Sequence, residues 1–394
     1  MMITDADIEK LLAVRSARPT VLSLYLEVPS HPPAMRSLPA RADELISEGA
    51  QADRNDAGQA CGDRELGEDR SIVRRMLEVH ARDWPGRSVA IFACGEPCLA
   101  EPLVLPSLAA DRAVLATRPH VRPLLVAQQR CRGYYLAVVD RHDAWVFRAT
   151  EGRIERLTLP AGVRIPGLGG WYGLEAHRVR ERITALAGHP YADVAAALGR
   201  LMTGGGPEPL VVGGCQKGVR QFLAALPDDT SSQVIASFAA DPHAVTLAQM
   251  AELASQAARS WSEEREQRAV TEAGQARDDL NATGLQVCLA AVNVGAAGLL
   301  IVPEDGLVPG FVCQRCGKLS ETGTDCPDWG AASMAVPDLV EEMVVQARHD
   351  GALVETVREP PGGIMARLRF PLSCGEAAGD AAYPTGEAVG SVRA

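Results

Sequence analysis

Two groups of residues in this sequence have types and spacings that could do chemistry: a glycine-rich stretch in the middle of the chain and a set of cysteines near its end. The stretch 166–173 reads PGLGGWYG and runs directly into the basic helical segment 174–183. Its glycines let the backbone approach another polymer closely or adopt positive φ. A helix opening behind the loop adds unpaired N–H groups and a positive dipole end. The same glycines would also suit a flexible surface turn.

The predicted helix behind this loop carries four candidate cationic side chains that could meet phosphate. Apolar residues recur in it at helical spacing and form a stripe to be buried, whereas Arg178 and Arg182 fall on another face. An alternative is a solvated face, on which Glu175 and Glu181 pair locally with the arginines. The cationic residues are His177, Arg178, Arg180 and Arg182.

The cysteines Cys313, Cys316 and Cys326 are spaced like zinc ligands. Cys313 and Cys316 lie in a C-x-x-C-G knuckle, and Cys326 begins a second, similar turn, C-P-x-x-G. A structural zinc wants four tetrahedral ligands, usually from two such pairs. The fourth cysteine position holds Trp329, although Asp325 or Asp328 could supply an oxygen. The pattern therefore leaves two readings open, a zinc site with an incomplete ligand set or a degenerate ribbon without metal.

Composition indicates a folded protein with a basic middle part. The chain has 394 residues and a net charge of −11, and its hydrophobic fraction of 47% predicts folded domains. Residues 120–224 contain fourteen Lys and Arg against eight Asp and Glu, a net charge of +6, so the remainder carries −17. A basic module inside an acidic protein is expected where one part must face phosphate. With no apolar run of the roughly eighteen residues that a membrane helix needs and no signal-peptide pattern at the start, we expect a cytoplasmic protein with no membrane contact.

The elements that would position these residues indicate an α/β fold of three mixed domains. We expect an N-terminal α/β domain over 1–120, a middle domain over 121–275 with the glycine loop, a C-terminal α/β domain over 276–372 with the ribbon-like insert, and a disordered tail over 373–394. In the middle domain, alternating apolar residues predict strands at 134–140, 144–148 and 153–159 before the loop. In the third domain, the glycine pair at 362–363 opens a stretch that we expect to be an edge strand.

This order of features resembles the archaeal and eukaryotic class-one peptide chain release factors and their relative Pelota, most closely the bacterial members of that superfamily. The features are the G-x-G-G loop before a basic helix, the ribbon-like insert, and the final strand GGIMARLRF at 362–370. The resemblance covers residues 136–370. It implies three domains and a loop that enters the catalytic centre of the ribosome, where a Gly-Gly-Gln motif helps place the water that hydrolyses peptidyl-tRNA.

The sequence departs from the superfamily at the residue that matters most for hydrolysis. The two glycines fall on Gly169 and Gly170, but Trp171 stands where the glutamine is expected. An indole donates one hydrogen bond and offers no acceptor to water. No Asn-Ile-Lys-Ser motif for reading stop codons is present in the sequence either. The resemblance therefore implies ribosome binding, whereas Trp171 and the missing Asn-Ile-Lys-Ser motif argue against hydrolysis and stop-codon decoding.

Three functional hypotheses follow. The first is a non-hydrolytic translation factor that occupies the aminoacyl site of stalled or hibernating ribosomes and contacts rRNA, with a translational GTPase as a conceivable partner. The second is a peptidyl-tRNA hydrolase that acts in peptide release or ribosome rescue through the backbone N–H of Trp171 and an ordered water. The third is a soluble interaction module with no ribosomal role, whose basic middle domain is incidental.

Overall fold

The structure is a computed structural model of the full chain. It describes residues 3–16, 21–57, 63–95, 99–105, 110–130, 133–140, 144–150, 153–157, 191–203, 208–241, 244–275, 277–323, 325–326 and 328–372. No helix within these ranges is long and apolar enough to cross a bilayer. The expected tail at 373–394 lies outside the described residues.

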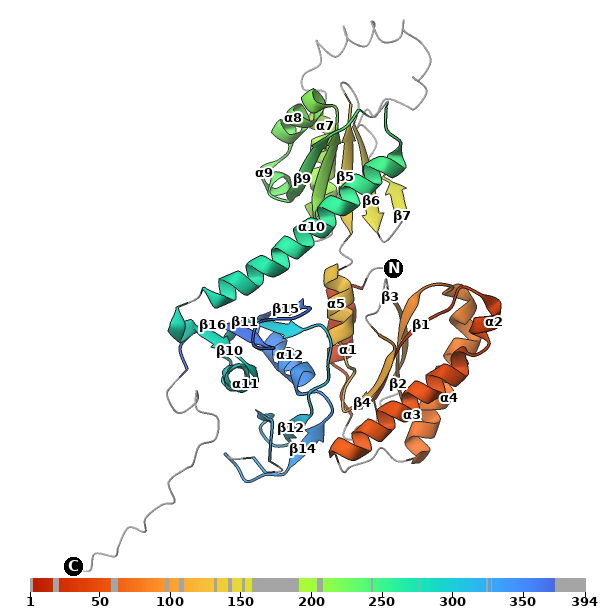
Figure 1. The fold of residues 1–394 in the computed structure, drawn as a ribbon, viewed down its shortest axis with the longest axis vertical. Coiled ribbons are helices and arrows are strands. Elements are labelled where there is room, and N and C mark those ends of the chain that lie inside the picture. Colours follow the sequence, from red (N-terminus) through yellow and green to blue (C-terminus); the bar gives the residue numbers. More distant parts are fainter. Residues whose placement is uncertain are drawn as a thin grey trace, which may run out of the picture. The chain divides into compact units, whose positions relative to one another are not determined.

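The chain forms two compact units (Figure 1). Unit 1 combines Met1–Gln128 with Glu266–Ala394, and unit 2 is Gln129–Arg265. The expected first and third domains thus share one compact unit, although each has a sheet of its own. Unit 2 lies within the range 121–275 expected for the middle domain, and the expected domain bounds stay predictions.

Unit 2 is built on a five-stranded sheet in the order β7-β6-β5-β8-β9. β5, β8 and β9 are parallel, while β6 and β7 extend the sheet in antiparallel pairing. Its elements are β5 (Tyr134–Val139), β6 (Ala144–Thr150), β7 (Arg153–Arg156), α7 (Ala192–Thr203), β8 (Leu210–Gly214), α8 (Gln216–Ala225), α9 (Asp228–Ser231), β9 (Val234–Ala239) and α10 (Leu247–Gly274).

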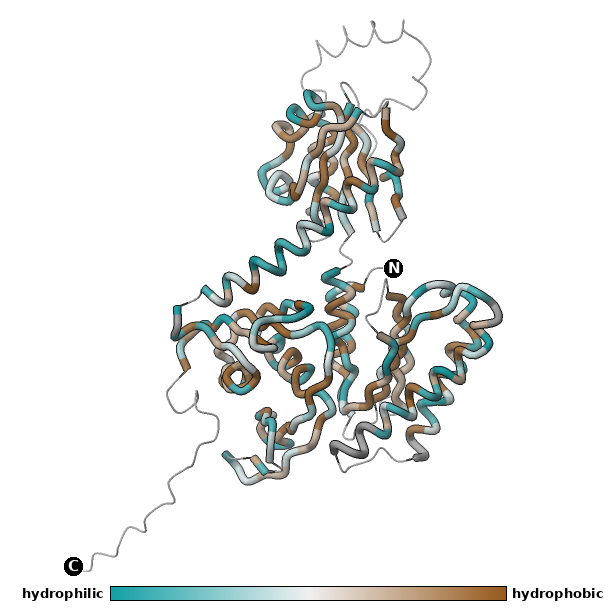
Figure 2. Tube along the Cα trace, viewed as in Figure 1, coloured by the Kyte–Doolittle hydropathy of each residue, from teal (hydrophilic) through white to brown (hydrophobic). Residues whose placement is uncertain are grey.

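Helices cover both faces of this sheet because successive side chains of a strand point to opposite sides. From β5, Ala137 and Val139 pack in one core with α7 and α8. Leu136 and Val138 pack in the other with Met250 and Ala254 of α10. Helix α10 continues beyond that core with a largely polar surface, teal in Figure 2, and ends in unit 1.

The N-terminal part of unit 1 is an antiparallel sheet in the order β3-β2-β1-β4. One face packs against α3 and α4, and the opposite face contributes to the largest core of the unit. The elements are α1 (Asp5–Leu12), β1 (Val21–Glu27), α2 (Pro32–Met35), α3 (Leu38–Ala57), α4 (Asp63–His80), η1 (Ala81–Asp83), β2 (Ser88–Cys94), β3 (Leu99–Leu105), β4 (Arg112–Ala116) and α5 (Arg122–Arg130).

The C-terminal part adds a second sheet, in the order β10-β16-β11-β15, and a small third one, β13-β12-β14. The largest core joins side chains of the first sheet, such as Tyr25 and Phe92, to Val340 and Met343 of α12. The elements are η3 (Asp278–Leu280), β10 (Asn281–Thr283), α11 (Leu285–Asn293), β11 (Ala297–Pro303), β12 (Gly310–Cys313), β13 (Leu319–Ser320), β14 (Ser333–Val336), α12 (Leu339–His349), β15 (Leu353–Val357) and β16 (Met365–Leu368).

The expectation that the last strand lies at an edge is wrong. β16 pairs with β11 on one side and with β10 on the other, so it lies inside the sheet. The glycine pair before it does make a turn, since Gly362 and Gly363 have φ of +69° and +81°. The short strand β10 covers the side of β16 that would otherwise be exposed.

Candidate functional site

The loop residues Gly169, Gly170 and Trp171 and the cationic residues His177, Arg178, Arg180 and Arg182 all lie outside the described residues. Their roles stay predictions. The structure does describe the two residues that flank this segment, Leu157 and Tyr191, and the part of unit 2 to which they are attached.

Both flanks are fixed to the sheet of unit 2. The N–H of Leu157 donates to the carbonyl of Val146 at 2.9 Å, continuing the pairing of β7 with β6. Tyr191 is 1% exposed, and its hydroxyl donates to the carbonyl of Asp140, directly after β5. Its ring meets Phe222 of α8 edge to face, with centroids 6.0 Å apart. The segment that carries the glycine loop therefore begins and ends on a packed base.

The glycine pair at the end of β8, Gly213 and Gly214, is structural. Gly214 has φ of +147°, and a Cβ there would lie 1.9 Å from the carbonyl oxygen of Val139. A Cβ on Gly213 would lie 2.4 Å from the ring of Phe238. The pair lets β8 pack closely between its neighbours and turn into α8.

Two basic residues on α8 went unnoticed in the sequence analysis. Lys217 and Arg220 are exposed in the first turns of this helix, which begins at the carboxyl end of β8. The carbonyl of Asp140, which accepts from Tyr191, lies at the corresponding end of the parallel neighbour β5. Only the sheet topology shows that these residues and one flank of the glycine loop share an edge of unit 2.

The second candidate site lies in the small sheet β13-β12-β14, between β11 and α12. The first knuckle starts at Cys313, whose N–H donates to the carbonyl of Lys318 at 2.9 Å. The N–H of Gly317 donates back to the carbonyl of Cys313 at 2.9 Å, with φ of +76° at the glycine. The N–H of Arg315 reaches the Cys313 sulfur at 3.4 Å.

The second turn repeats this backbone pattern at the same offsets. The N–H of Cys326 donates to the carbonyl of Ala331 at 2.8 Å, and the N–H of Gly330 donates to the carbonyl of Cys326 at 2.7 Å. Gly330 has φ of +57°. Trp329 therefore occupies the knuckle position that Cys316 occupies in the first turn.

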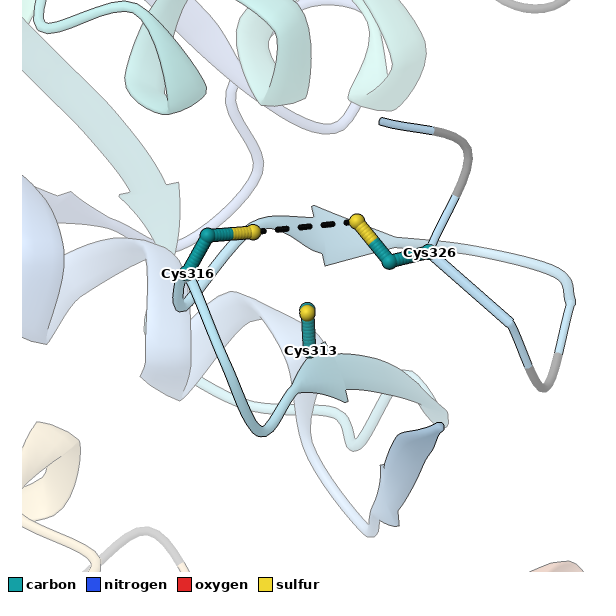
Figure 3. A group of neighbouring side chains, drawn as sticks. All are labelled: Cys313, Cys316 and Cys326. Carbon is teal, nitrogen blue, oxygen red and sulfur yellow. Dashed lines mark hydrogen bonds between the residues drawn. The ribbon is translucent and has the colours of Figure 1, made fainter. Parts of the chain in front are cut away.

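The structure brings the three cysteine sulfurs together, within 4.8 Å of one another (Figure 3). Cys313 and Cys326 are 1% and 3% exposed, whereas Cys316 is exposed to solvent. The Sγ atoms of Cys316 and Cys326 are 3.7 Å apart. The N–H groups of Cys316 and Arg315 lower the pKa of Cys313 to about 7. Desolvation and the neighbouring sulfurs raise the pKa of Cys316.

Asp328 lies apart from the sulfurs. Both of its carboxylate oxygens accept from Lys318 Nζ at 3.0 Å, and the described donors that gather with Cys313 are cysteines alone. The Trp329 side chain is 55% exposed, and the Arg315 guanidinium lies 4.2 Å from the ring centroid. The residues present thus fit three positions of a tetrahedral thiolate site and leave the fourth to none of the described side chains.

A third cluster of ionisable groups is buried in unit 1. His120 Nε2 lies 3.0 Å from Asp338 Oδ2, and Arg122 Nη2 lies 2.8 Å from the same oxygen. The Glu341 carboxylate accepts from the backbone N–H groups of Val121 and Arg122 at 2.7 and 3.0 Å. His120, Asp338 and Glu341 could in principle surround a cation. The Arg122 guanidinium already supplies the positive charge there, so we interpret the cluster as structural.

The buried cluster clamps the base of the small sheet. Arg122 donates to the carbonyls of Pro303 and Gly306, just before β12, and binds Asp338, just after β14. Asp338 also accepts from the N–H of Val308 at 3.3 Å. Burial alone would raise the pKa of Asp338, but the hydrogen bond from His120 and the charge of Arg122 outweigh burial and lower it.

In comparison with known proteins, the segment that carries the glycine loop matches a protein family. Residues 119–276 match the family described as bacterial archaeo-eukaryotic release factor family 10. No curated protein matches the sequence at a significant level.

Several solved structures are similar over much of their length. The archaeal translation termination factor aRF1 is 15% identical over 92% of this chain and 96% of its own, with a TM-score of 0.21. A ribosome-bound archaeal Pelota, from a model with ABCE1, is 17% identical over 73% and 79%, with a TM-score of 0.40. Dom34 from S. cerevisiae is 9% identical over 75% and 83%, with a TM-score of 0.41.

Proposed function

We propose that this chain is a member of the bacterial branch of the archaeo-eukaryotic release-factor superfamily and a ribosome-associated translation factor that does not hydrolyse peptidyl-tRNA. In this proposal it occupies the aminoacyl site of stalled or hibernating ribosomes. The family match over residues 119–276 carries the proposal, because this segment contains the glycine loop and the basic helix.

The non-hydrolytic part rests on Trp171. Glycines at 169 and 170 keep the freedom of backbone that a close approach to RNA requires. The residue after them must supply an acceptor as well as a donor to hold an attacking water, and indole has no acceptor. An aromatic ring suits a different task, stacking on an unpaired base. We infer that the loop fills its site instead of activating water there.

Electrostatics supports RNA as the binding partner. Arg178, Arg180 and Arg182 stand in the basic segment that follows the loop, and Lys217 and Arg220 are exposed on α8. Lys and Arg contacts to phosphate dominate the affinity for nucleic acid and make it depend on salt. The fixed flanks of the loop segment, at Leu157 and Tyr191, would let these charges act from a stable base.

Co-sedimentation with ribosomes as a function of salt tests this proposal. Changing Arg178, Arg180 and Arg182 together to Glu removes three candidate phosphate contacts. We expect weaker binding and a slope of log affinity against log salt that falls by about 2 to 3. The matched control changes Arg36, Arg75 and Arg82 of unit 1, all exposed, to Glu, which alters net charge equally and should leave binding intact. Unchanged pelleting of the first variant at physiological salt would contradict the proposal.

A GTPase partner is a further part of the proposal. Dom34 is a translation termination-like factor that interacts with Hbs1. We propose that a translational GTPase delivers this chain to the ribosome in a comparable way. Pull-down with the full chain as bait, in the presence and absence of a non-hydrolysable GTP analogue, should retain such a partner. Equal recovery of all translational GTPases with bait and with empty resin would rule it out.

A further inference from the structure

We propose that Cys313, Cys316 and Cys326 bind one zinc ion as a three-thiolate site whose fourth coordination position is open to an exchangeable external ligand, water in the resting state. A closed structural ribbon needs four protein ligands, whereas sites that keep a position for water use three. The inference concerns unit 1 and does not depend on the proposed role at the ribosome.

The spacing of the sulfurs fits a tetrahedral ion. Zinc–sulfur bonds of about 2.3 Å place two sulfurs of a tetrahedron about 3.8 Å apart. Cys316 and Cys326 have their Sγ atoms at 3.7 Å, and Cys313 completes a group within 4.8 Å. The same separation is far longer than a disulfide bond of about 2.05 Å. The three sulfurs thus form one face of a tetrahedron.

The matching turns locate the missing ligand. Cys313 and Cys326 start turns with the same hydrogen bonds at the same offsets, and each turn has a glycine of positive φ at its fifth position. The fourth position is Cys316 in one turn and Trp329 in the other. The backbone for a fourth thiolate is therefore present, but indole nitrogen only donates and cannot ligate the ion.

The neighbours of Trp329 keep the position from being filled by other described side chains. The Arg315 guanidinium lies 4.2 Å from the indole centroid of Trp329, which is 55% exposed. Lys318 holds both oxygens of Asp328. Cys316 is exposed, so small molecules can reach this side of the group.

Charge also favours three thiolates with a neutral fourth ligand. Loading follows three thiols plus Zn²⁺ and water, giving a zinc trithiolate aqua centre of net charge −1 and three released protons. The backbone N–H of Arg315 reaches the Cys313 sulfur at 3.4 Å, and such a hydrogen bond stabilises negative charge on the sulfur. A fourth thiolate would bring the net charge of the centre to −2.

Cobalt substitution in the full chain tests the inference. Co²⁺ is added to metal-free protein under reducing, anaerobic conditions, and its absorption is compared with that of Trp329→Cys. We expect about one bound metal per chain in both proteins, by titration and by elemental analysis after exchange for Zn²⁺. Sulfur-to-cobalt charge transfer should be about one third stronger in Trp329→Cys, in proportion to four thiolates instead of three.

An added small thiol distinguishes an open position from a closed one. Titration with 2-mercaptoethanol should strengthen the charge-transfer band of the wild type and leave that of Trp329→Cys unchanged. Cys215→Ser, which removes a thiol in unit 2, should behave as the wild type. Three results would each overturn the inference: no bound metal after reconstitution, a Cys316–Cys326 disulfide in the reduced preparation, or a wild-type spectrum that already matches four thiolates.

Discussion

The glycine loop of unit 2 and the cysteine-bearing insert of unit 1, from β12 to β14, each have a tryptophan at a motif position. The two regions differ in what that tryptophan leaves intact. Each keeps the glycines that shape a motif and has tryptophan where the motif expects its working side chain, Trp171 in the loop and Trp329 in the insert. In the loop, the resemblance assigns the placing of water to a single glutamine, and we propose that Trp171 in its place removes hydrolysis. In the insert, three of the four thiols that a closed zinc ribbon needs lie within 4.8 Å of one another, and these are the ligands of the proposed zinc site.

The two regions are also attached differently. Described flanks of the loop segment are held by neutral hydrogen bonds, such as that of Tyr191 to the Asp140 carbonyl. The base of the insert is held by buried charges, with Arg122 and His120 on Asp338. Neutral bonds contribute modestly and independently of pH, whereas a broken buried ion pair leaves an uncompensated charge. The following predictions test these contrasts.

The largest effect should come from breaking the clamp at the insert. Arg122→Met removes the guanidinium and leaves Asp338 buried at 2% exposure. We expect unit 1 to lose about 3 to 5 kcal/mol of stability, read by hydrogen exchange in peptides from α12 and β14. The double variant Arg122→Met/Asp338→Leu should recover part of the loss, because the carboxylate that Arg122 neutralises is removed with it. Additive losses in the double variant would mean that the pair is not coupled.

We expect one substitution in the glycine loop to produce a gain of function. Trp171→Gln restores an amide that can both donate to and accept from water. If the loop enters the catalytic centre as proposed, release of labelled peptide from ribosomal peptidyl-tRNA should rise about 10²-fold over the wild type. Gly170→Ala in the same background should abolish the gain. Release by the wild type itself, lost in Gly170→Ala, would instead favour the hydrolase hypothesis.

Much of the fold could be predicted where local pattern decides structure. Alternating apolar residues located β5 and β6 within a few residues. The strands β3 and β4 were missed; Pro102 and Glu101 interrupt the apolar pattern of β3. β16 was misplaced at an edge, because its partner β10 is only three residues long.

The candidate sites also differ in whether the local sequence reveals them. The cysteines were found because ligand spacing is written in the sequence. The buried clamp was missed because its partners are more than 200 residues apart, as with His120 and Asp338. From the sequence, a domain boundary is expected between residues 120 and 121, within this cluster. Lys217 and Arg220 required the sheet topology to place them beside a flank of the loop segment.

Lowering the pH should change the stability of unit 1, which holds the insert, and leave the stability of unit 2 unchanged. The folded-state pKa of Asp338 is lowered, so its ionisation stabilises unit 1 above its unfolded pKa of about 3.9. That contribution is lost as pH falls through the folded value. Burial raises the pKa of Glu342, so its protonation adds stability as pH falls from neutral. We expect unit 1 to pass through a stability maximum on acidification.

Variants separate the two titrations. Asp338→Asn should reduce the loss of unit 1 stability at low pH. Glu342→Gln should reduce the gain in stability that occurs at higher pH, before that loss. The slope of stability against pH is the quantity to compare, because either substitution also changes stability at neutral pH. Hydrogen exchange in α12 supplies the reading for unit 1 and exchange in α7 that for unit 2. Parallel pH profiles in the two units would contradict the contrast.

The smallest effect should come from the hydrogen bond that anchors the loop segment. Tyr191→Phe removes a buried hydroxyl and leaves the Asp140 carbonyl without that donor, at a cost of about 1 to 2 kcal/mol in unit 2. Tyr134→Phe is the matched control, since its hydroxyl reaches the Ala251 carbonyl at 3.3 Å from a half-buried position, and it should cost less. If the base positions the loop, Tyr191→Phe also weakens ribosome binding while Tyr134→Phe does not. Equal binding by both variants would show that the loop acts independently of its anchor.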